Sequence, residues 1–222
     1  MSRVHDMGGR FGDGPVSAGD APRFEEDWHA RALALTLACG ALGQWNIDTS
    51  RHAREKVAPK DYASFSYYEK WMAGLADLLV EKDIVTRQEL QSGKGQGGSL
   101  LIPKALKAKD VPAALAKGAP ADRPAESETL FKVGDPVRTR MSANQLVDGG
   151  HTRLPSYAAK AKGRIVRLQG HHVLPDSSAH GLGDAPEPLY AVAFSAWELW
   201  QNPEHPKDEV ILDLWQSYLI PA

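Results

Sequence analysis

Cysteine is almost absent from this chain, in which Cys39 is the single thiol among 222 residues. One thiol cannot form an intrachain disulfide, and it cannot build a thiolate metal cluster without help from another chain. Any soft-metal chemistry would therefore depend on ligands that a partner supplies.

Long apolar runs and an excess of one charge are absent as well. The sequence contains no run of about 18 apolar residues, which a transmembrane helix would need. Residues 1–6 also lack the apolar core of a signal peptide. We therefore expect a cytoplasmic chain without a membrane partner. The 26 basic and 28 acidic residues leave a net charge of −2, and no basic patch is interleaved with aromatic residues. This nearly neutral charge and the lack of a basic patch indicate that the chain does not bind nucleic acid.

The N-terminal half divides into an arm and a helical domain. The first 22 residues are rich in glycine and proline and have almost no apolar periodicity, which predicts an extended arm that lies on another surface. From Phe24 onward apolar residues recur at helical spacing, so we predict a helical domain over residues 23–91. Gly40 and Gly43 are expected to end its first helix.

Capping residues predict where three further helices begin. Asp48 is expected to cap a short helix, and Ser64 or Ser66 a longer one. Thr86 and Glu89 have the spacing of a capping box, which predicts a last short turn of helix.

The composition of the C-terminal half predicts a linker and then a β domain. Residues 92–129 are rich in glycine, alanine, lysine and proline and read as a linker, with a short helix at 111–117. Short alternating segments follow and read as strands; they span residues 136–140, 164–169, 189–194 and 209–215. The fold class is therefore α+β, with an N-terminal extended arm and helical domain followed by a C-terminal SH3-like β-barrel or roll over 130–222.

The segment 149–157, Gly-Gly-His-Thr-Arg-Leu-Pro-Ser-Tyr, is the most informative motif. It places Arg153 between a glycine pair and a proline, where rigid backbone positions the side chain. A guanidinium keeps its charge and offers a planar fork of five donors that suits paired acid oxygens. Taken alone, an exposed arginine more often pairs with a surface carboxylate, so the other motifs decide the interpretation.

Motifs along the whole chain resemble the β subunit of nitrile hydratase. They occur in the same order at both ends and in the middle, and they cover most of the chain outside the linker. The motifs are His5-Asp6-Met7-Gly8-Gly9, Tyr67-Tyr68, Gly150-His151-Thr152-Arg153-x-Pro155-x-Tyr157, Glu198-Leu199-Trp200 and Asp213-Leu214-Trp215-x-x-Tyr218-Leu219.

This resemblance implies an enzyme that hydrates nitriles to amides and works as a heterodimer, with a dimer of heterodimers as the larger assembly. The α subunit would carry low-spin Co(III) or Fe(III) on a cysteine-rich loop, two of whose cysteines are oxidised to sulfinate and sulfenate. No metal would be bound by the present chain. The family's two β-subunit arginines that hydrogen-bond the oxidised sulfurs match Arg51 and Arg153, which are our candidate catalytic residues.

The resemblance also implies a substrate pocket and a partner interface. The pocket positions match Ile47, Ser50, Tyr67 and Trp71. Without the resemblance, Tyr67, Tyr68 and Trp71 would read as a core stripe at helical spacing. The predicted interface with the α subunit comprises His5, Gly8, Gly9, Tyr68, His151 and Tyr157.

Two features of the C-terminal half need separate interpretation. Family members often have an Arg-Gly-Lys-x-Gly run after the equivalent of Tyr157, whereas residues 158–162 here are Ala-Ala-Lys-Ala-Lys, so a contact with the partner is expected to differ. His171, His172, His180 and Asp176 could be read as a metal cluster. Adjacent histidines on a strand point to opposite sides, so we expect them to be structural.

Two other functions remain open. The chain could be a thiocyanate hydrolase-type subunit, although the homologous parts of that enzyme lie on two separate chains. It could also be a non-catalytic assembly or metal-delivery partner. Small accessory proteins of that kind resemble only the N-terminal half of the β subunit, so the presence of both halves favours the full subunit.

Overall fold

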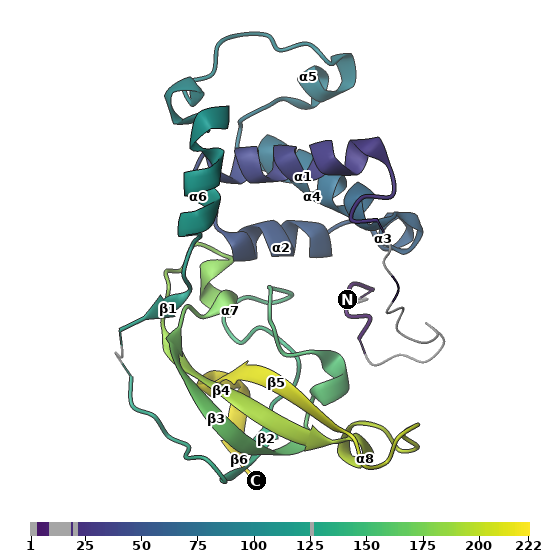
Figure 1. Cartoon of the computed structure of the whole chain (residues 1–222), viewed down its shortest axis with the longest axis vertical. Coiled ribbons are helices and arrows are strands. Elements are labelled where there is room, and N and C mark those ends of the chain that lie inside the picture. Colours follow the sequence, from purple (N-terminus) through teal and green to yellow (C-terminus); the bar gives the residue numbers. More distant parts are fainter. Residues whose placement is uncertain (1–3, 9–18, 20–21, 125–126) are drawn as a thin grey trace. The chain divides into compact units, whose positions relative to one another are not determined.

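The computed structural model describes residues 4–8, 19, 22–124 and 127–222 of the chain (Figure 1). It divides into two compact units, Met1–His5 with Arg10–Ala119 and Asp6–Gly9 with Pro120–Ala222. The first unit is helical and the second contains an antiparallel sheet, which confirms the predicted mixture of helices and sheet. Most of the predicted arm over residues 1–22, Gly9 included, lies outside the described residues.

Six α-helices make up the described part of the helical unit. They are α1 (Asp27–Gly40), α2 (Ile47–Glu55), α3 (Pro59–Ser64), α4 (Tyr67–Glu81), α5 (Arg87–Ser92) and α6 (Val111–Lys117). Single 3-10 turns at Ile102–Lys104 and Ala108–Asp110 precede α6. None of the described helices is long and apolar enough to cross a membrane.

Most helix starts follow the predicted capping chemistry, with one correction. The backbone N–H of Ser66 donates to Glu69 at 2.7 Å at the start of α4, and Thr86 and Glu89 form the reciprocal pair before α5. The prediction of Asp48 as the cap of α2 was wrong, because Asn46 is the capping residue and accepts the Thr49 N–H at 2.9 Å. Both residue types cap well, and only Asn46 has the extended backbone that the position needs.

Helices α2 and α4 approach each other closely at Gly74. A Cβ atom placed there would lie 3.1 Å from the backbone N and Cα of Arg54. Two helices can come this close only where one of them lacks a side chain. Leu75 and Leu78 of α4 are buried beside this contact, as is Ala53 of α2.

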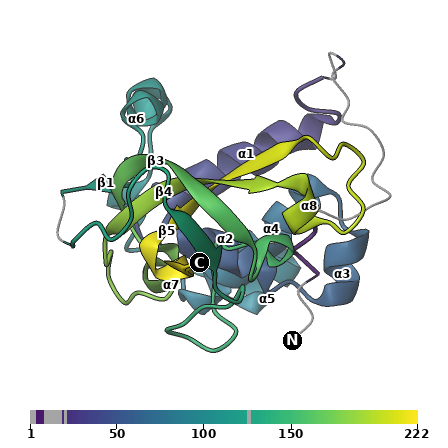
Figure 2. The same ribbon diagram turned by 90° about the horizontal axis from the view of Figure 1, so that it is seen from below.

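The second unit is built on six antiparallel strands, which Figure 2 shows from below. They are β1 (Asp122–Arg123), β2 (Pro136–Thr139), β3 (Lys162–His172), β4 (Glu187–Ser195), β5 (Glu209–Trp215) and β6 (Leu219–Pro221). The strand order is β5-β4-β3-β2-β6, and β1 also pairs with β3. Single turns of helix, α7 (Pro175–Ser178) and α8 (Ala196–Leu199), flank β4.

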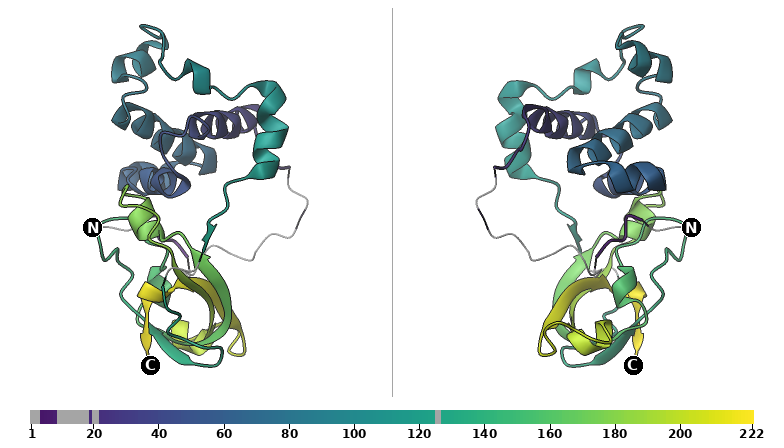
Figure 3. Two further views of the ribbon diagram at one scale, coloured as in Figure 1. Left: turned by 90° about the vertical axis from the view of Figure 1, so that its left-hand side faces the viewer. Right: turned by 90° about the vertical axis from the view of Figure 1, so that its right-hand side faces the viewer.

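The four strands predicted from sequence correspond to β2 to β5. Strands β3 and β4 extend beyond the predicted bounds, β5 matches them, and β2 ends one residue earlier. Strands β1 and β6 were not predicted, because two or three residues are too few for an alternating pattern. The sheet curls strongly, as Figure 3 shows, and β3 carries register irregularities against β4 between Ile165 and Arg167 and between Leu168 and Gly170. Such irregularities raise the local twist of a strand.

The curled sheet encloses a core of large apolar side chains. Tyr190, Phe194 and Ile165 are fully buried in it, and the Tyr190 hydroxyl donates to Gln216 at 2.8 Å. Strand β3 crosses this core at Gly163. A Cβ atom there would lie 2.8 Å from Phe194 and 2.9 Å from the Ala193 carbonyl.

The substitution Gly163→Ala is therefore expected to destabilise the chain by about 1–3 kcal/mol, the usual cost of overpacking. Gly97→Ala is the control, because a Cβ at Gly97 meets nothing within 4 Å. Denaturant unfolding of the two variants measures the difference. Equal midpoints for both variants would contradict the packing described for β3.

Candidate functional site

A pocket of about 250 Å³ lies within the helical unit. Its lining residues are His5, Arg51, Arg54, Glu55, Tyr62, Tyr67, Lys70 and Trp71. Helix α2 supplies residues one turn apart, and α4 supplies residues three and four apart, so each helix presents one face to the pocket. Four predicted site residues thus come together here, namely Arg51, Tyr67, Trp71 and His5.

Arg51 is held in place by its own helix. Its Nη1 donates to Asp48 Oδ1 at 2.8 Å, one turn earlier on α2. The Asp48 side chain is 8% exposed, whereas the Arg51 side chain is 36% exposed. A buried carboxylate fixes the direction of a partly exposed guanidinium, and the remaining donors of the fork can bind an acceptor outside this chain.

The aromatic residues of α4 divide between the pocket and a structural cluster. Tyr67 is 64% exposed and its ring lies 5.5 Å from the ring of Trp71. Tyr68 instead packs on His29 of α1 at 4.7 Å between ring centroids, within a cluster that also contains Phe24 and Trp28.

The remaining predicted pocket residues lie on α2 outside the lining. Ile47 is 62% exposed, and Ser50 is partly buried. The lining instead includes Arg54, which no sequence motif singled out and which lies one turn after Arg51 on α2. Its guanidinium carbon lies 4.5 Å from the centroid of the Trp71 ring.

The Arg153 loop of the second unit is fixed by side chains that bind its backbone. Asn144 Nδ2 donates to the carbonyls of His151 at 2.6 Å and of Asp176 at 2.9 Å. The His151 N–H donates to His180 Nε2 at 3.1 Å. Gly150 leaves room for these contacts, because a Cβ there would lie 2.7 Å from His180 and 2.8 Å from Asn144.

A buried polar pair supports Arg153 itself. The Arg153 N–H donates to the Tyr218 hydroxyl at 3.2 Å, and that hydroxyl donates in turn to the carboxylate of Asp176. Burial raises the pKa of Asp176 from 3.8 to about 6, partly offset by the bond from Tyr218. Burial also raises the pKa of the Tyr218 hydroxyl, so it stays protonated as a donor.

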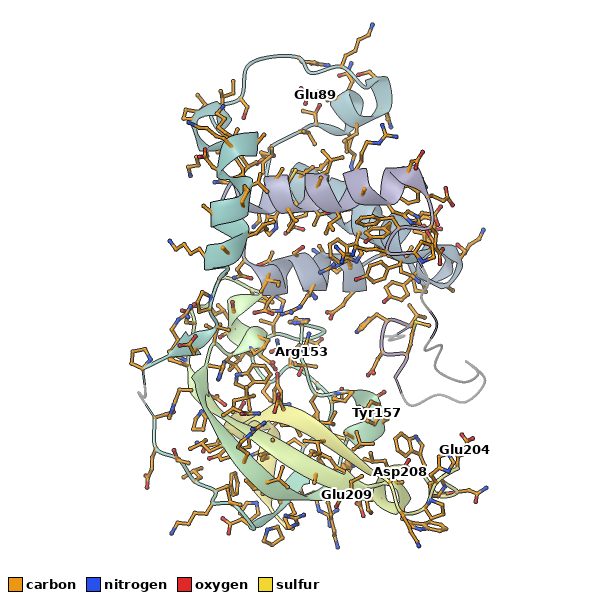
Figure 4. All side chains as sticks on the ribbon, viewed as in Figure 1. Glu89, Arg153, Tyr157, Glu204, Asp208 and Glu209 are labelled. Atoms are coloured by element: carbon orange, nitrogen blue, oxygen red, sulfur yellow. The ribbon has the colours of Figure 1, made fainter. Side chains whose placement is uncertain are left out.

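The side chain of Arg153 takes no part in this support, which binds its backbone. The residue is exposed, and Figure 4 labels it on the loop beside α7. Within residues 4–8, 19, 22–124 and 127–222, its side chain forms no hydrogen bond or ion pair. Its backbone is therefore fixed while its charged fork remains available for an acceptor from another molecule.

Three predicted interface residues, Gly8, His151 and Tyr157, belong to the second unit, and two of them, Gly8 and Tyr157, lie side by side. The Ser156 N–H donates to Asp6 at 2.9 Å, and a Cβ at Gly8 would lie 3.0 Å from the Tyr157 ring. Tyr157, labelled in Figure 4, stacks on Trp200 with 5.9 Å between ring centroids. His151 is 2% exposed, so within this chain its side chain is buried.

The histidines that could have been read as a metal cluster bind backbone atoms instead. His171 Nε2 lies 2.9 Å from the Ser127 carbonyl, and His172 Nε2 lies 3.3 Å from the Gln169 carbonyl. His180 accepts the His151 N–H described above. The structural interpretation of these histidines agrees with these contacts.

Comparison with known protein families identifies both halves of the chain. The family model described as nitrile hydratase beta subunit, N-terminal, matches residues 1–119, and the corresponding C-terminal model matches residues 120–221. The chain belongs to the nitrile hydratase β-subunit family. Members of this family are β subunits of a hydro-lyase that acts together with an α subunit, and they include cobalt-containing enzymes.

Two nitrile hydratase β subunits match the present chain over its full length. Nitrile hydratase subunit beta of Pseudomonas putida is 36% identical over 100% of both chains. The low-molecular weight cobalt-containing nitrile hydratase subunit beta of Rhodococcus rhodochrous is 34% identical, also over 100% of both. The expectation that the chain is a nitrile hydratase β subunit is confirmed.

A thiocyanate hydrolase relative matches only in part. Thiocyanate hydrolase subunit beta of Thiobacillus thioparus is 30% identical over 46% of this chain and 69% of that protein. A solved thiocyanate hydrolase from Thiobacillus thioparus, a recombinant apo-enzyme, is 29% identical over 43% of this chain and 78% of that chain, with a TM-score of 0.38. The nitrile hydratase matches extend over both units, so they are the more complete.

The buried pair beneath Arg153 gives a testable pH dependence. The pKa of Asp176 is raised to about 6, so between pH about 4 and about 6 the folded state keeps a proton that the unfolded state releases. The free energy of unfolding therefore falls as pH rises through this window. Asp176→Asn removes the titrating group, and the variant is expected to lose this part of the pH dependence. Denaturant unfolding at several pH values measures it, and parallel curves for both proteins would contradict the account.

Proposed function

We propose that this nitrile hydratase β subunit completes an active site on its α subunit by supplying Arg51 and Arg153 as donors to oxidised cysteine side chains. The observation that carries the proposal is that both arginines have fixed backbones and available guanidinium groups. One donor of Arg51 binds Asp48 and the others remain. The Arg153 residue is exposed, and its backbone N–H is held by the Tyr218 hydroxyl. Sulfinate and sulfenate oxygens are anionic acceptors that such forks suit.

The metal is proposed to be Co(III) or Fe(III) held by the α subunit. A soft low-spin metal favours thiolate ligands, and the present chain offers one thiol, Cys39. Burial raises the pKa of that thiol, which disfavours the thiolate form that binds metal. The metal would supply Lewis-acid chemistry that polarises the nitrile or the attacking water. The cobalt named for the Rhodococcus rhodochrous relative supports cobalt as one of the two choices.

The residues of this chain would bind and orient. Arg51 and Arg153 would offset the cost of burying negative charge on the oxidised sulfurs and hold their oxygens in one geometry. Tyr67 and Trp71 would form the wall of the substrate pocket. Their large apolar faces exclude water from a bound nitrile. Ile47 and Ser50 would extend the same wall along α2, and the product is the amide.

The remaining predicted contacts are proposed to bind the α subunit. His5, Gly8, Gly9, Tyr68, His151 and Tyr157 form this proposed set. We also propose that the curled sheet is an SH3-like roll, that the domains are 1–22, 23–91, 92–129 and 130–222, and that heterodimers pair into a dimer of heterodimers. The strong curl of the sheet in Figure 3 supports the first of these.

The two arginines give the direct test of this function. In the complex with the α subunit, Arg51→Lys and Arg153→Lys are each expected to lower turnover of a simple nitrile by at least about 100-fold, because an ammonium cannot reproduce the planar fork. Amide formation per bound metal is the measurement.

Matched controls separate the fork from general effects of charge or folding. Arg31→Lys in the helical unit and Arg167→Lys in the sheet unit change exposed arginines outside both candidate sites, and they should leave turnover unchanged. Unfolding midpoints of all four variants should stay close to that of the parent chain. Full turnover in both site variants would overturn the proposed role.

A further inference from the structure

Arg54 is a pocket residue whose stem and charged end are both held by contacts with α4. Its stem lies against Gly74 of α4, where an added Cβ would meet Arg54 Cγ at 2.8 Å. Its guanidinium lies over Trp71, three residues before Gly74 on the same helix. Two contacts with a single helix therefore fix both the stem and the charged end.

The charge of Arg54 lacks an acceptor within the described chain. Its guanidinium carries five N–H donors, lies over the face of the Trp71 ring and is attracted by the Glu55 carboxylate without forming an ion pair with it. Among the residues described, none accepts a hydrogen bond from it. A ring face stabilises the charge but does not replace hydrogen bonds. Burial lowers the pKa of Arg54, so desolvation of this charge has a cost that an anionic acceptor would offset.

The pocket as a whole is cationic. Lys70 lies over the Tyr62 ring at 4.8 Å and likewise has no ion pair among the residues described. Arg51 is paired with Asp48, and Glu55, the pocket's carboxylate, lies 3.2 Å from His52. Two cations, Arg54 and Lys70, thus face the same pocket, each over an aromatic ring and without an ion pair among the residues described. Glu55 attracts Arg54, so one carboxylate stands against three cationic side chains in this lining.

We propose that Arg54, assisted by Lys70, binds a carboxylate that enters the pocket from outside this chain. A carboxylate matches the two parallel N–H groups of the guanidinium, and the ammonium of Lys70 adds a second donor. The carboxylate has two chemical sources, a nitrile substrate with an acidic group at its far end or an acidic side chain of the α subunit. The inference rests on the proposed function, because it places this pocket beside the reacting nitrile.

The test uses the complex of this chain with its α subunit and two nitriles of nearly equal size. One is 4-cyanobenzoate, which carries a carboxylate, and the other is 4-cyanobenzamide, which is neutral. The variant Arg54→Met keeps the stem that packs on Gly74 while removing the charge. The measurements are the kcat/KM ratio of the two nitriles, the Kd of 4-cyanobenzoate by calorimetry, and the Kd of the heterodimer.

Each source of the carboxylate predicts a different result. If the substrate supplies it, Arg54→Met lowers the kcat/KM ratio of acid to amide at least about tenfold and weakens 4-cyanobenzoate binding by a similar factor. If the α subunit supplies it, the ratio stays constant and the heterodimer Kd rises at least about tenfold. Arg54→Lys should recover part of either loss, since it keeps the charge without the fork.

The inference is overturned if Arg54→Met changes neither the ratio nor either Kd. Arg31→Met is the control, because it removes an exposed arginine of α1 outside the pocket and should leave all three measurements unchanged. Turnover of 4-cyanobenzamide by the parent complex reports separately on the proposed function. If that turnover is absent, the two dissociation constants still test whether Arg54 binds a carboxylate.

Discussion

The close approach of α2 and α4 at Gly74 is the constraint on which the helical pocket depends. Because Gly74 has no side chain, the backbone of α2 at Arg54 can lie against α4. This contact places the arginines of α2 opposite the aromatic face of α4 and gives the pocket its cationic and aromatic character. A larger residue at Gly74 would separate the helices and move the lining side chains that α2 and α4 supply.

A different device positions Arg153 in the sheet unit. There the backbone of the loop is held by polar side chains, and the Tyr218 hydroxyl joins the Arg153 N–H to the buried Asp176 carboxylate. Burying such groups is costly unless they bind one another. In the helical unit the close contact at Gly74 fixes the backbone of α2 at Arg54, one turn after Arg51, and Asp48 binds one donor of Arg51. Both units thus fix the backbone near an arginine that keeps donors for another molecule. This shared arrangement is what the proposed role in the active site requires.

The sequence predicted local features well where one residue type decides the geometry. The capping box at Thr86 and the four longer strands were found because their signals lie within a few residues. The cap at Asn46 was missed, since Asp48 is an equally good capping residue two positions away. Strands β1 and β6 were missed because two or three residues carry no period.

Some residues of the candidate site were predicted and others were missed, because the missed ones depend on contacts between distant parts of the chain. The resemblance named Arg51, Tyr67 and Trp71, which do line one pocket. It gave no role to Arg54, whose position depends on Gly74 and Trp71 of another helix. Asp176 and Tyr218 lie 42 residues apart in the chain, so no local pattern could link them to Arg153.

An experimental structure of the complex with the α subunit tests the central claim most directly. We predict that the guanidinium groups of Arg51 and Arg153 lie within hydrogen-bond distance of oxidised cysteine oxygens of the α subunit. Finding either guanidinium in solvent, or bound only to carboxylates of this chain, would contradict the account.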